Sequence, residues 1–226
     1  MEIAYLGHSC FRLKSGQNTM LLDPFISGNP LAESISISDL KPDYILLSHG
    51  HQDHVLDVET IYGHGNASII ANFEVASWFQ KRGLENVIAM NLGGQLQLDF
   101  GRVKLVNAIH SSSMPDGSYG GNPVGFVIEM EDKCLYYAGD TALHQDMKLI
   151  RDQFSVDLAV LPIGGHYTMG LEDALKAADF VGCTRILGMH YDTFPPIAID
   201  HQASKNLADS QGKELILMQI GSSIKF

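Results

Sequence analysis

The feature that most constrains this chain is a cluster of metal-binding residue types, His49-Gly50-His51-Gln52-Asp53-His54. Three imidazoles and a carboxylate within one short segment suit zinc and neighbouring divalent metals, with no thiolate needed. The apolar run over residues 43–48 leads directly into this cluster and indicates a buried strand. Gly50 is expected to let the loop turn tightly. The alternative is a solvated histidine-rich loop, which the preceding strand disfavours.

Three further strand-like runs also end at a residue that can bind a metal. Residues 104–109 lead into His110, residues 134–139 into Asp140 and residues 185–189 into His190. In open α/β sheets, ligand sites gather outside the carboxyl ends of the strands, where loops converge. We therefore expect the four runs to deliver their polar residues to one sheet edge.

The remaining pattern alternates strand-like runs with amphipathic helices. Hairpins or meanders are expected over residues 1–26 and 96–138, where turn residues separate short apolar runs. Helices are expected over residues 74–82, 142–154, 171–181 and 200–210, with Asp140 and Thr141 as candidate caps of the second. This order predicts an α/β fold, an αββα sandwich of two mixed β-sheets flanked by helices. The length of 226 residues fits a single domain over residues 1–226.

Charge and cysteine usage limit the partners and the compartment. The net charge of -11 disfavours nucleic acid as the main partner, because phosphates attract Lys and Arg. Two bound divalent cations would offset about four charges locally, so a small anionic substrate remains compatible. Because no signal-peptide pattern and no apolar run near the roughly 20 residues of a membrane span is found, we expect a cytoplasmic protein without a membrane partner. The cysteines lie in apolar stretches and are expected to be buried free thiols: Cys10, Cys134 and Cys183.

The histidine cluster resembles the HxHxDH signature of the metallo-β-lactamase superfamily at every position. His110, Asp140 and His190 follow in the order typical of that family. The chain is also similar to a narrower branch of small metal-dependent hydrolases related to L-ascorbate-6-phosphate lactonase. The motifs that carry this similarity are Gly7-His8-Ser9, Leu22-Asp23-Pro24, His110-Ser-Ser-Ser113, Gly120-Gly-Asn-Pro123 and Thr193-Phe-Pro-Pro196.

The resemblance implies a centre with two metal ions. His49, His51 and His110 would hold the first ion, Asp53, His54 and His190 the second, and Asp140 would bridge them. Two cations about 3.5–4 Å apart share a water, lower its pKa and present hydroxide to a carbonyl or phosphoryl centre. The nitrogen-rich first site favours zinc, and the mixed second site is also suited to Mn, Fe, Co or Ni. Asp53 is the candidate catalytic residue, which would orient the water or move a proton.

Weaker candidates lie in loops near these ligands. His8, in a Gly-His-Ser turn, is expected to contact substrate or to support a ligand. Asp23 is either an acceptor for a ligand histidine or part of an ordinary Asx turn. In the glycine-rich loop after His110, Tyr119 and Asn122 are candidate substrate contacts, with a flexible connection as the alternative. His166 follows another strand-like run and is expected to line the pocket rather than to bind a metal.

These residues favour a hydrolase that acts on an ester, lactone or phosphodiester bond of a small molecule. Within the same superfamily, an iron-dependent sulfur dioxygenase would not need the complete second ligand set, and a flavodiiron protein would need a further flavin domain. A nuclease would need a basic arm that the acidic chain lacks. A non-catalytic module would be expected to have lost ligands. Since related small hydrolases often assemble, a homo-oligomer is compatible with the resemblance.

Overall fold

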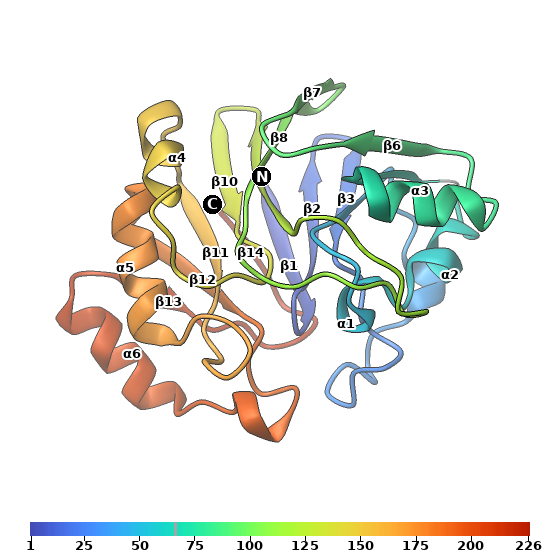
Figure 1. The fold of residues 1–226 in the computed structure, drawn as a ribbon. Coiled ribbons are helices and arrows are strands. Elements are labelled where there is room, and N and C mark those ends of the chain that lie inside the picture. Colours follow the sequence, from blue (N-terminus) through green and yellow to red (C-terminus); the bar gives the residue numbers. More distant parts are fainter. Residues whose placement is uncertain (66) are drawn as a thin grey trace.

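The structure is a computed structural model that describes residues 1–65 and 67–226. Two seven-stranded sheets form the centre of the molecule, with α1, α2 and α3 on one side and α4, α5 and α6 on the other (Figure 1). The predicted αββα sandwich is therefore confirmed. Within the described residues, no helix is both long and apolar enough to cross a membrane.

The first sheet contains the N-terminal strands together with the last strand of the chain. Its antiparallel part has the order β14-β1-β2-β3, and β4, β5 and β6 continue it in parallel from β3. Because β1 pairs with β14, Glu2 lies opposite Lys225 and the two termini lie close together (Figure 1). The strands are β1 (Glu2–Gly7), β2 (Cys10–Ser15), β3 (Asn18–Leu22), β4 (Tyr44–Leu47), β5 (Ser68–Asn72), β6 (Val87–Met90) and β14 (Ser223–Lys225).

The second sheet repeats this plan. An antiparallel meander from β7 to β10 is followed in parallel by β11, β12 and β13. Both meanders match the segments expected from the sequence. The strands are β7 (Gln95–Leu98), β8 (Gly101–Asn107), β9 (Val124–Met130), β10 (Lys133–Tyr137), β11 (Leu158–Pro162), β12 (Arg185–Met189) and β13 (Glu214–Ile216).

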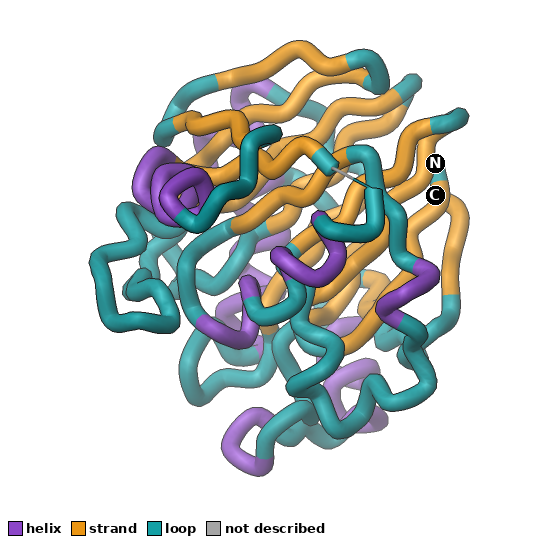
Figure 2. The backbone as a smooth tube through the Cα atoms, turned by 90° about the vertical axis from the view of Figure 1, so that its right-hand side faces the viewer, coloured by secondary structure: helices purple, strands orange, loops and turns teal. Residues whose placement is uncertain are grey.

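Helices cover the outer faces of both sheets (Figure 1), and Figure 2 turns the side with α1, α2 and α3 toward the viewer. α5 matches the expected residues 171–181, and α3 and α6 differ from their expected ranges by one residue. The helix expected over residues 142–154 begins only at Met147, so Asp140 and Thr141 do not cap it. The helices are α1 (Gln52–Val55), α2 (Val58–Tyr62), α3 (Phe73–Lys81), α4 (Met147–Gln153), α5 (Leu171–Val181) and α6 (His201–Ser210), with 3₁₀ turns at Ile37–Asp39 and Pro195–Ile197.

The hydrophobic core joins the two sheets. One buried cluster contains side chains of both inner faces, such as Phe11 and Met20 from the first sheet and Phe126 and Ile128 from the second. A second cluster lies on the first sheet and includes apolar residues of α2 and α3. The three cysteines are buried and free, as expected. Since both sheets pack through one core, residues from different halves of the chain are held in fixed positions at the sheet edge.

Candidate metal centre

The histidine cluster leaves the first sheet directly after β4. Ser48 and His49 follow that strand, and the short helix α1 carries Asp53 and His54. Gly50 does not have a positive φ, so the expected tight turn is not its role. A Cβ at Gly50 would lie 2.4 Å from Sδ of Met114, so the glycine is needed for close approach of the loop that follows His110.

The second sheet supplies the other three candidates from strands that run in one direction. β8 and β10 point the same way because β9 is antiparallel to both, and β12 continues the parallel part. His110, Asp140 and His190 therefore follow the carboxyl ends of these strands at one edge of the sheet. The structure brings these residues together with the cluster from the first sheet.

Three histidines form the first group of ligand candidates. One ring nitrogen from each of His49, His51 and His110 lies within 4.8 Å of the others. Nε2 of His49 is 3.0 Å from Nδ1 of His51. Nδ1 of His49 lies 3.0 Å from the Ser48 hydroxyl, which orients the ring. Three convergent imidazole nitrogens are a ligand set that zinc prefers.

Asp140 stands between this group and a second one. Its Oδ2 lies 3.6 Å from Nε2 of His110, 3.0 Å from Nε2 of His190 and 3.4 Å from Nε2 of His54. Asp53 Oδ2 completes the second group, 3.9 Å from Nε2 of His190. Oδ1 of Asp140 is buried and has no hydrogen-bond partner among the described residues. A buried carboxylate that is only partly satisfied and surrounded by imidazoles fits a position beside bound cations.

Asp23 holds one of the candidate ligands, His54, in position. It is fully buried at the end of β3, and its Oδ2 lies 2.8 Å from Nδ1 of His54. The same carboxylate accepts hydrogen bonds from the backbone and hydroxyl of Ser48, over 2.8 and 2.5 Å, and from the Tyr137 hydroxyl over 2.7 Å. Asp23 is therefore an acceptor for a ligand-candidate histidine and not part of an ordinary Asx turn. Its bond to Nδ1 leaves Nε2 of His54 free to face Asp140.

His8 supports Asp53 in a similar way. The His8 side chain is fully buried, with Nε2 3.2 Å from Asp53 Oδ2 and Nδ1 2.9 Å from the Thr193 hydroxyl. Burial is the main cause that lowers the pKa of His8 to about 4, so its ring is neutral near pH 7. A neutral His8 that donates from Nε2 to the Asp53 carboxylate must accept the Thr193 hydroxyl proton at Nδ1. One ring nitrogen of His8 also lies within 4.8 Å of ligand-type atoms of Asp53, His54 and His190.

The charges of the cluster follow from burial and from neighbouring groups. Burial, reinforced by the other imidazoles, lowers the pKa of His49 and favours the neutral form that binds metals. Burial alone would also lower the pKa of His54, but the carboxylates of Asp140 and Asp23 outweigh it and raise that pKa. Burial would raise the pKa of Asp53, yet the imidazoles of His54 and His8 hold it below its usual range. The carboxylates thus stabilise positive charge in the centre, which is what a bound cation supplies.

A pocket of about 420 Å³ opens directly onto these residues. The metal-ligand candidates that line it are His51, Asp53, His110, Asp140 and His190. Ser111, Tyr167 and Phe194 form the rest of its lining. Its volume is in the range of small-molecule sites, and its lining includes the histidines and aspartates that are candidate metal ligands.

The structure does not place the other expected substrate contacts in this pocket. Tyr119 lines a separate hollow beside Trp78 and is 68% exposed. Asn122 is exposed, and its backbone carbonyl accepts a hydrogen bond from Asn72. His166 is also exposed and does not line the pocket, whereas its neighbour Tyr167 does. The start of the loop after His110 stays beside the centre, where the Gly50 backbone donates to the Ser112 hydroxyl. Its later part is held by Asn72, which donates to the Gly120 carbonyl, so Tyr119 and Asn122 lie outside the pocket lining.

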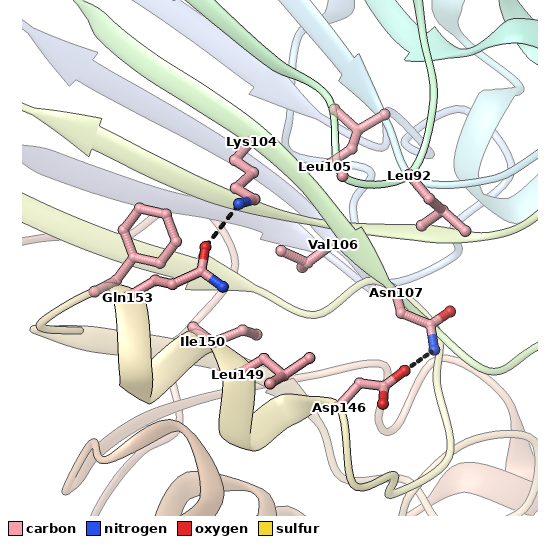
Figure 3. A pocket seen from close by; sticks show the side chains of 11 residues that line it. Leu92, Lys104, Leu105, Val106, Asn107, Asp146, Leu149, Ile150 and Gln153 are labelled. Carbon is pink, nitrogen blue, oxygen red and sulfur yellow. Dashed lines mark hydrogen bonds between the residues drawn. The ribbon is translucent and has the colours of Figure 1, made fainter.

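A second hollow of about 340 Å³ lies between β8 and α4, and no histidine lines it (Figure 3). Lys104 donates to Gln153 on one side of this hollow, and Asn107 donates to Asp146 on another. Val106, Leu149 and Ile150 lie between these pairs. It offers apolar contact but none of the chemistry-bearing groups gathered around Asp140, so we place the functional site at the histidine pocket.

The structure adds four residues to the site, and the sequence signals that could have indicated them differ in strength: Thr193, Phe194, Tyr167 and Tyr137. Thr193 and Phe194 belong to a motif that the family resemblance had already marked, Thr193-Phe-Pro-Pro196. Tyr167 follows β11, which is the strand between the two that precede Asp140 and His190, so sheet order was the available signal. Tyr137 has only the pattern of a buried strand residue, and its bond to Asp23 was not visible from the sequence.

Known proteins resemble this chain over its whole length. The family model described as "Beta-lactamase superfamily domain" matches residues 2–190. A protein of Flavobacterium johnsoniae named a UPF0173 metal-dependent hydrolase is 54% identical over 225 residues, which covers 100% of both chains. A Thermus thermophilus protein of the same description is 44% identical, over 95% of this chain and 94% of that one.

A solved structure agrees with this relationship. Igni18, described as a novel metallo hydrolase from Ignicoccus hospitalis, superposes with a TM-score of 0.89 at 33% identity, covering 100% of this chain and 98% of that chain. Together with the fold and the gathered histidines and aspartates, these matches assign a family. The chain belongs to the metallo-β-lactamase superfamily, among the UPF0173 metal-dependent hydrolases.

Proposed function

We propose that this chain is a dinuclear metal-dependent hydrolase that cleaves an ester, lactone or phosphodiester bond of a small molecule. The position of Asp140 carries the proposal. One carboxylate oxygen of Asp140 lies between His110 of the first group and His54 and His190 of the second, at 3.0–3.6 Å. A carboxylate in that position is suited to bridging two cations.

The donor atoms indicate which metals each group would hold. His49, His51 and His110 offer nitrogen only, which favours zinc. Asp53, His54 and His190 mix oxygen with nitrogen, so zinc or manganese is expected there, and iron, cobalt or nickel is compatible. When bound, two such cations would lower the pKa of a shared water and stabilise negative charge on the attacked carbonyl or phosphoryl oxygen.

Asp53 is the group that would move the proton. Its side chain is 29% exposed and lines the pocket, whereas Asp140 is almost fully buried. Hydrolysis forms a bond from the water oxygen to the acyl carbon or phosphorus and breaks the bond to the leaving oxygen. One water proton passes to Asp53 and from there to the leaving oxygen. His8 contacts the Asp53 carboxylate and is itself contacted by the Thr193 hydroxyl, so these two contacts would hold Asp53 in place for the transfer.

A small molecule is the partner that the molecule's size and charge support. The pocket volume of about 420 Å³ suits a ligand of modest size. The net charge of -11 disfavours nucleic acid. We place the protein in the cytoplasm, since its three buried, free thiols fit a reducing compartment.

An iron-dependent dioxygenase is the competing function of the same fold. It would use one metal ion, so the second group would have no role. Here Asp53, His54 and His190 are brought together with their own supports, Asp23 and His8. The complete second group therefore favours hydrolysis over the redox reaction.

Metal content per chain is the first test. Protein purified without chelator or metal-affinity tag would be measured by plasma mass spectrometry, then reloaded with zinc or manganese and tested on simple esters, lactones and phosphodiesters. About two divalent ions per chain with metal-dependent hydrolysis would support the proposal. A single iron per chain would favour the dioxygenase, and no binding after reloading would reject the centre.

A further inference from the structure

Two aromatic side chains form the walls of the histidine pocket. Tyr167 and Phe194 line it together with the ligand candidates. Tyr167 belongs to the loop after β11, and β11 lies between β10 and β12, the strands that lead to Asp140 and His190. Phe194 follows His190 on the loop after β12. Sheet order therefore places both rings next to the residues that would bring about hydrolysis.

The Phe194 ring and the loop that carries Tyr167 are held by their surroundings. Phe194 packs edge-on against His8 with ring centroids 5.6 Å apart, and its ring centroid is 6.3 Å from that of Phe25. The loop of Tyr167 is closed by a bridge between Gly164 and Gly170. The backbone of Met169 in this loop donates to the Thr141 carbonyl over 3.0 Å, beside Asp140. The positions of both walls are thus tied to the candidate ligands.

Tyr167 nevertheless leaves much of its ring in contact with water. It is 54% exposed and lines the pocket, so part of its ring is available to a ligand there. An exposed aromatic surface beside a reactive centre is a typical contact for a ligand. A flat apolar group placed against it would remove that surface from water and stack on the ring.

The charges of the pocket disfavour a strongly anionic substrate. Among the described residues, no Lys or Arg lines it. Apart from histidines, its polar groups are the carboxylates of Asp53 and Asp140 and the hydroxyls of Ser111 and Tyr167. A phosphate on the substrate, away from the scissile bond, would find no guanidinium or ammonium partner among these lining residues.

We propose that the substrates of this site are neutral carboxylic esters or lactones with a flat apolar group next to the scissile bond, and that Tyr167 and Phe194 select them. This inference rests on the proposed hydrolase. For an ester, water adds its oxygen to the acyl carbon, the bond from that carbon to the alcohol oxygen breaks, and the alcohol leaves with one proton. The acid product keeps the flat group in the pocket that Tyr167 and Phe194 line.

Three methyl esters with one common leaving group test the selection. Methyl phenylacetate carries a flat ring, methyl cyclohexylacetate an apolar ring that is not flat, and methyl phosphonoacetate an anion. With zinc-loaded protein, we expect kcat/KM to fall in that order. Comparing the phenyl-to-cyclohexyl ratio between wild type and variants cancels the intrinsic reactivity of the esters.

Variants at the two rings assign the selection to them. Tyr167→Ala and Phe194→Leu should each lower the phenyl-to-cyclohexyl ratio about three- to tenfold, because each removes one aromatic pair. Tyr167→Phe keeps the ring and should keep the ratio. Phe73→Ala is the matched control, since Phe73 is an aromatic residue of similar exposure, 58%, outside this pocket.

A binding measurement separates this inference from the proposed function. Calorimetry of phenylacetate and cyclohexylacetate with zinc-loaded protein should show tighter binding of phenylacetate in wild type and equal binding in Tyr167→Ala. If the esters are hydrolysed but Tyr167→Ala changes neither the phenyl-to-cyclohexyl ratio of kcat/KM nor that of the affinities, the substrate class is rejected while the hydrolase stands. The same follows if the phosphonate is the preferred ester. If no ester is hydrolysed yet ring-dependent binding is found, ester hydrolysis is rejected and the aromatic site stands.

Discussion

The Asp23 carboxylate, at the end of a strand in the first sheet, lies 2.7 Å from the Tyr137 hydroxyl of the second sheet. The same oxygen of Asp23 faces Nδ1 of His54 at 2.8 Å. A ligand candidate is therefore oriented by a contact that crosses the core. Burial, together with the charge of Asp23, raises the pKa of Tyr137, so its hydroxyl stays a donor.

Tyr137 and its neighbour Tyr136 offer a matched pair of substitutions. Tyr137→Phe should lower the free energy of unfolding by about 1–2 kcal/mol, because a buried carboxylate loses a donor. The Tyr136 hydroxyl is buried with no hydrogen-bond partner among the described residues. Tyr136→Phe should therefore leave stability unchanged or raise it by up to about 1 kcal/mol. Urea unfolding measures both, and an equal loss in the two variants would contradict the contact.

Asp23→Asn should weaken the second metal position. The amide would place N–H groups where the Ser48 and Tyr137 hydroxyls and His54 now donate, so the ring of His54 would lose its orientation. We expect metal affinity to fall about 10- to 100-fold, measured by competition with a chelator. Asp43→Asn, which alters an exposed acceptor for the Thr19 backbone, is the control. Unchanged affinity in Asp23→Asn would show that this carboxylate does not orient the ligand.

The contact between His8 and Asp53 predicts a defect in turnover. His8 has a positive φ of 55°, which Asn tolerates better than most residues, so His8→Asn should keep the fold. With zinc retained, kcat should fall about 10- to 100-fold, since Asp53 loses its donor. If zinc content falls instead, His8 is itself a ligand.

Thr193 tests the same contact from its other end. Thr193→Val removes the hydroxyl that faces Nδ1 of His8 and should lower kcat, whereas Thr193→Ser keeps the hydroxyl and should behave as wild type. Steady-state kinetics on one ester, with metal content measured in parallel, compares the variants. Equal rates in Thr193→Val and wild type would exclude the hydroxyl from positioning Asp53.

Asp140→Asn should remove the shared carboxylate. We expect metal content to fall from about two ions per chain to one or fewer, and hydrolysis to fall at least about 100-fold, since several kcal/mol of charge stabilisation is lost. Asp146→Asn is the control, because Asp146 is exposed on the same connection and its side chain accepts a hydrogen bond from Asn107, away from the histidines. Full activity in Asp140→Asn would contradict the assignment of Asp140 as the carboxylate that the two metal positions share.

The ligand candidates could be predicted because each follows a strand. His110, Asp140 and His190 lie far apart in the sequence, yet an apolar run ends just before each, and sheet order then brings them together. The same reasoning failed for the start of α4, where an apolar spacing continued into residues 142–146 that are not helical. Asp140 favoured a helix cap by residue type, but its surroundings place it among imidazoles.

The pocket walls were less predictable, for a physical reason. The sequence favoured His166, whereas the structure places Tyr167 in the lining. Which of two neighbouring side chains faces a pocket depends on how the loop is closed, here by Gly164 and Gly170, and not on residue type. Tyr119 shows the same limit, since the anchoring of its loop by Asn72 determines where it lies.

The candidate ligands are divided between the two sheets, and this has a consequence for how the protein matures. Four come from the segment after β4, which includes α1, and three from loops after strands of the second sheet. Neither set can form the centre alone, so tight metal capture must wait until the two layers have docked. Binding would then lock the finished sandwich, which makes bound metal a marker of correctly assembled molecules.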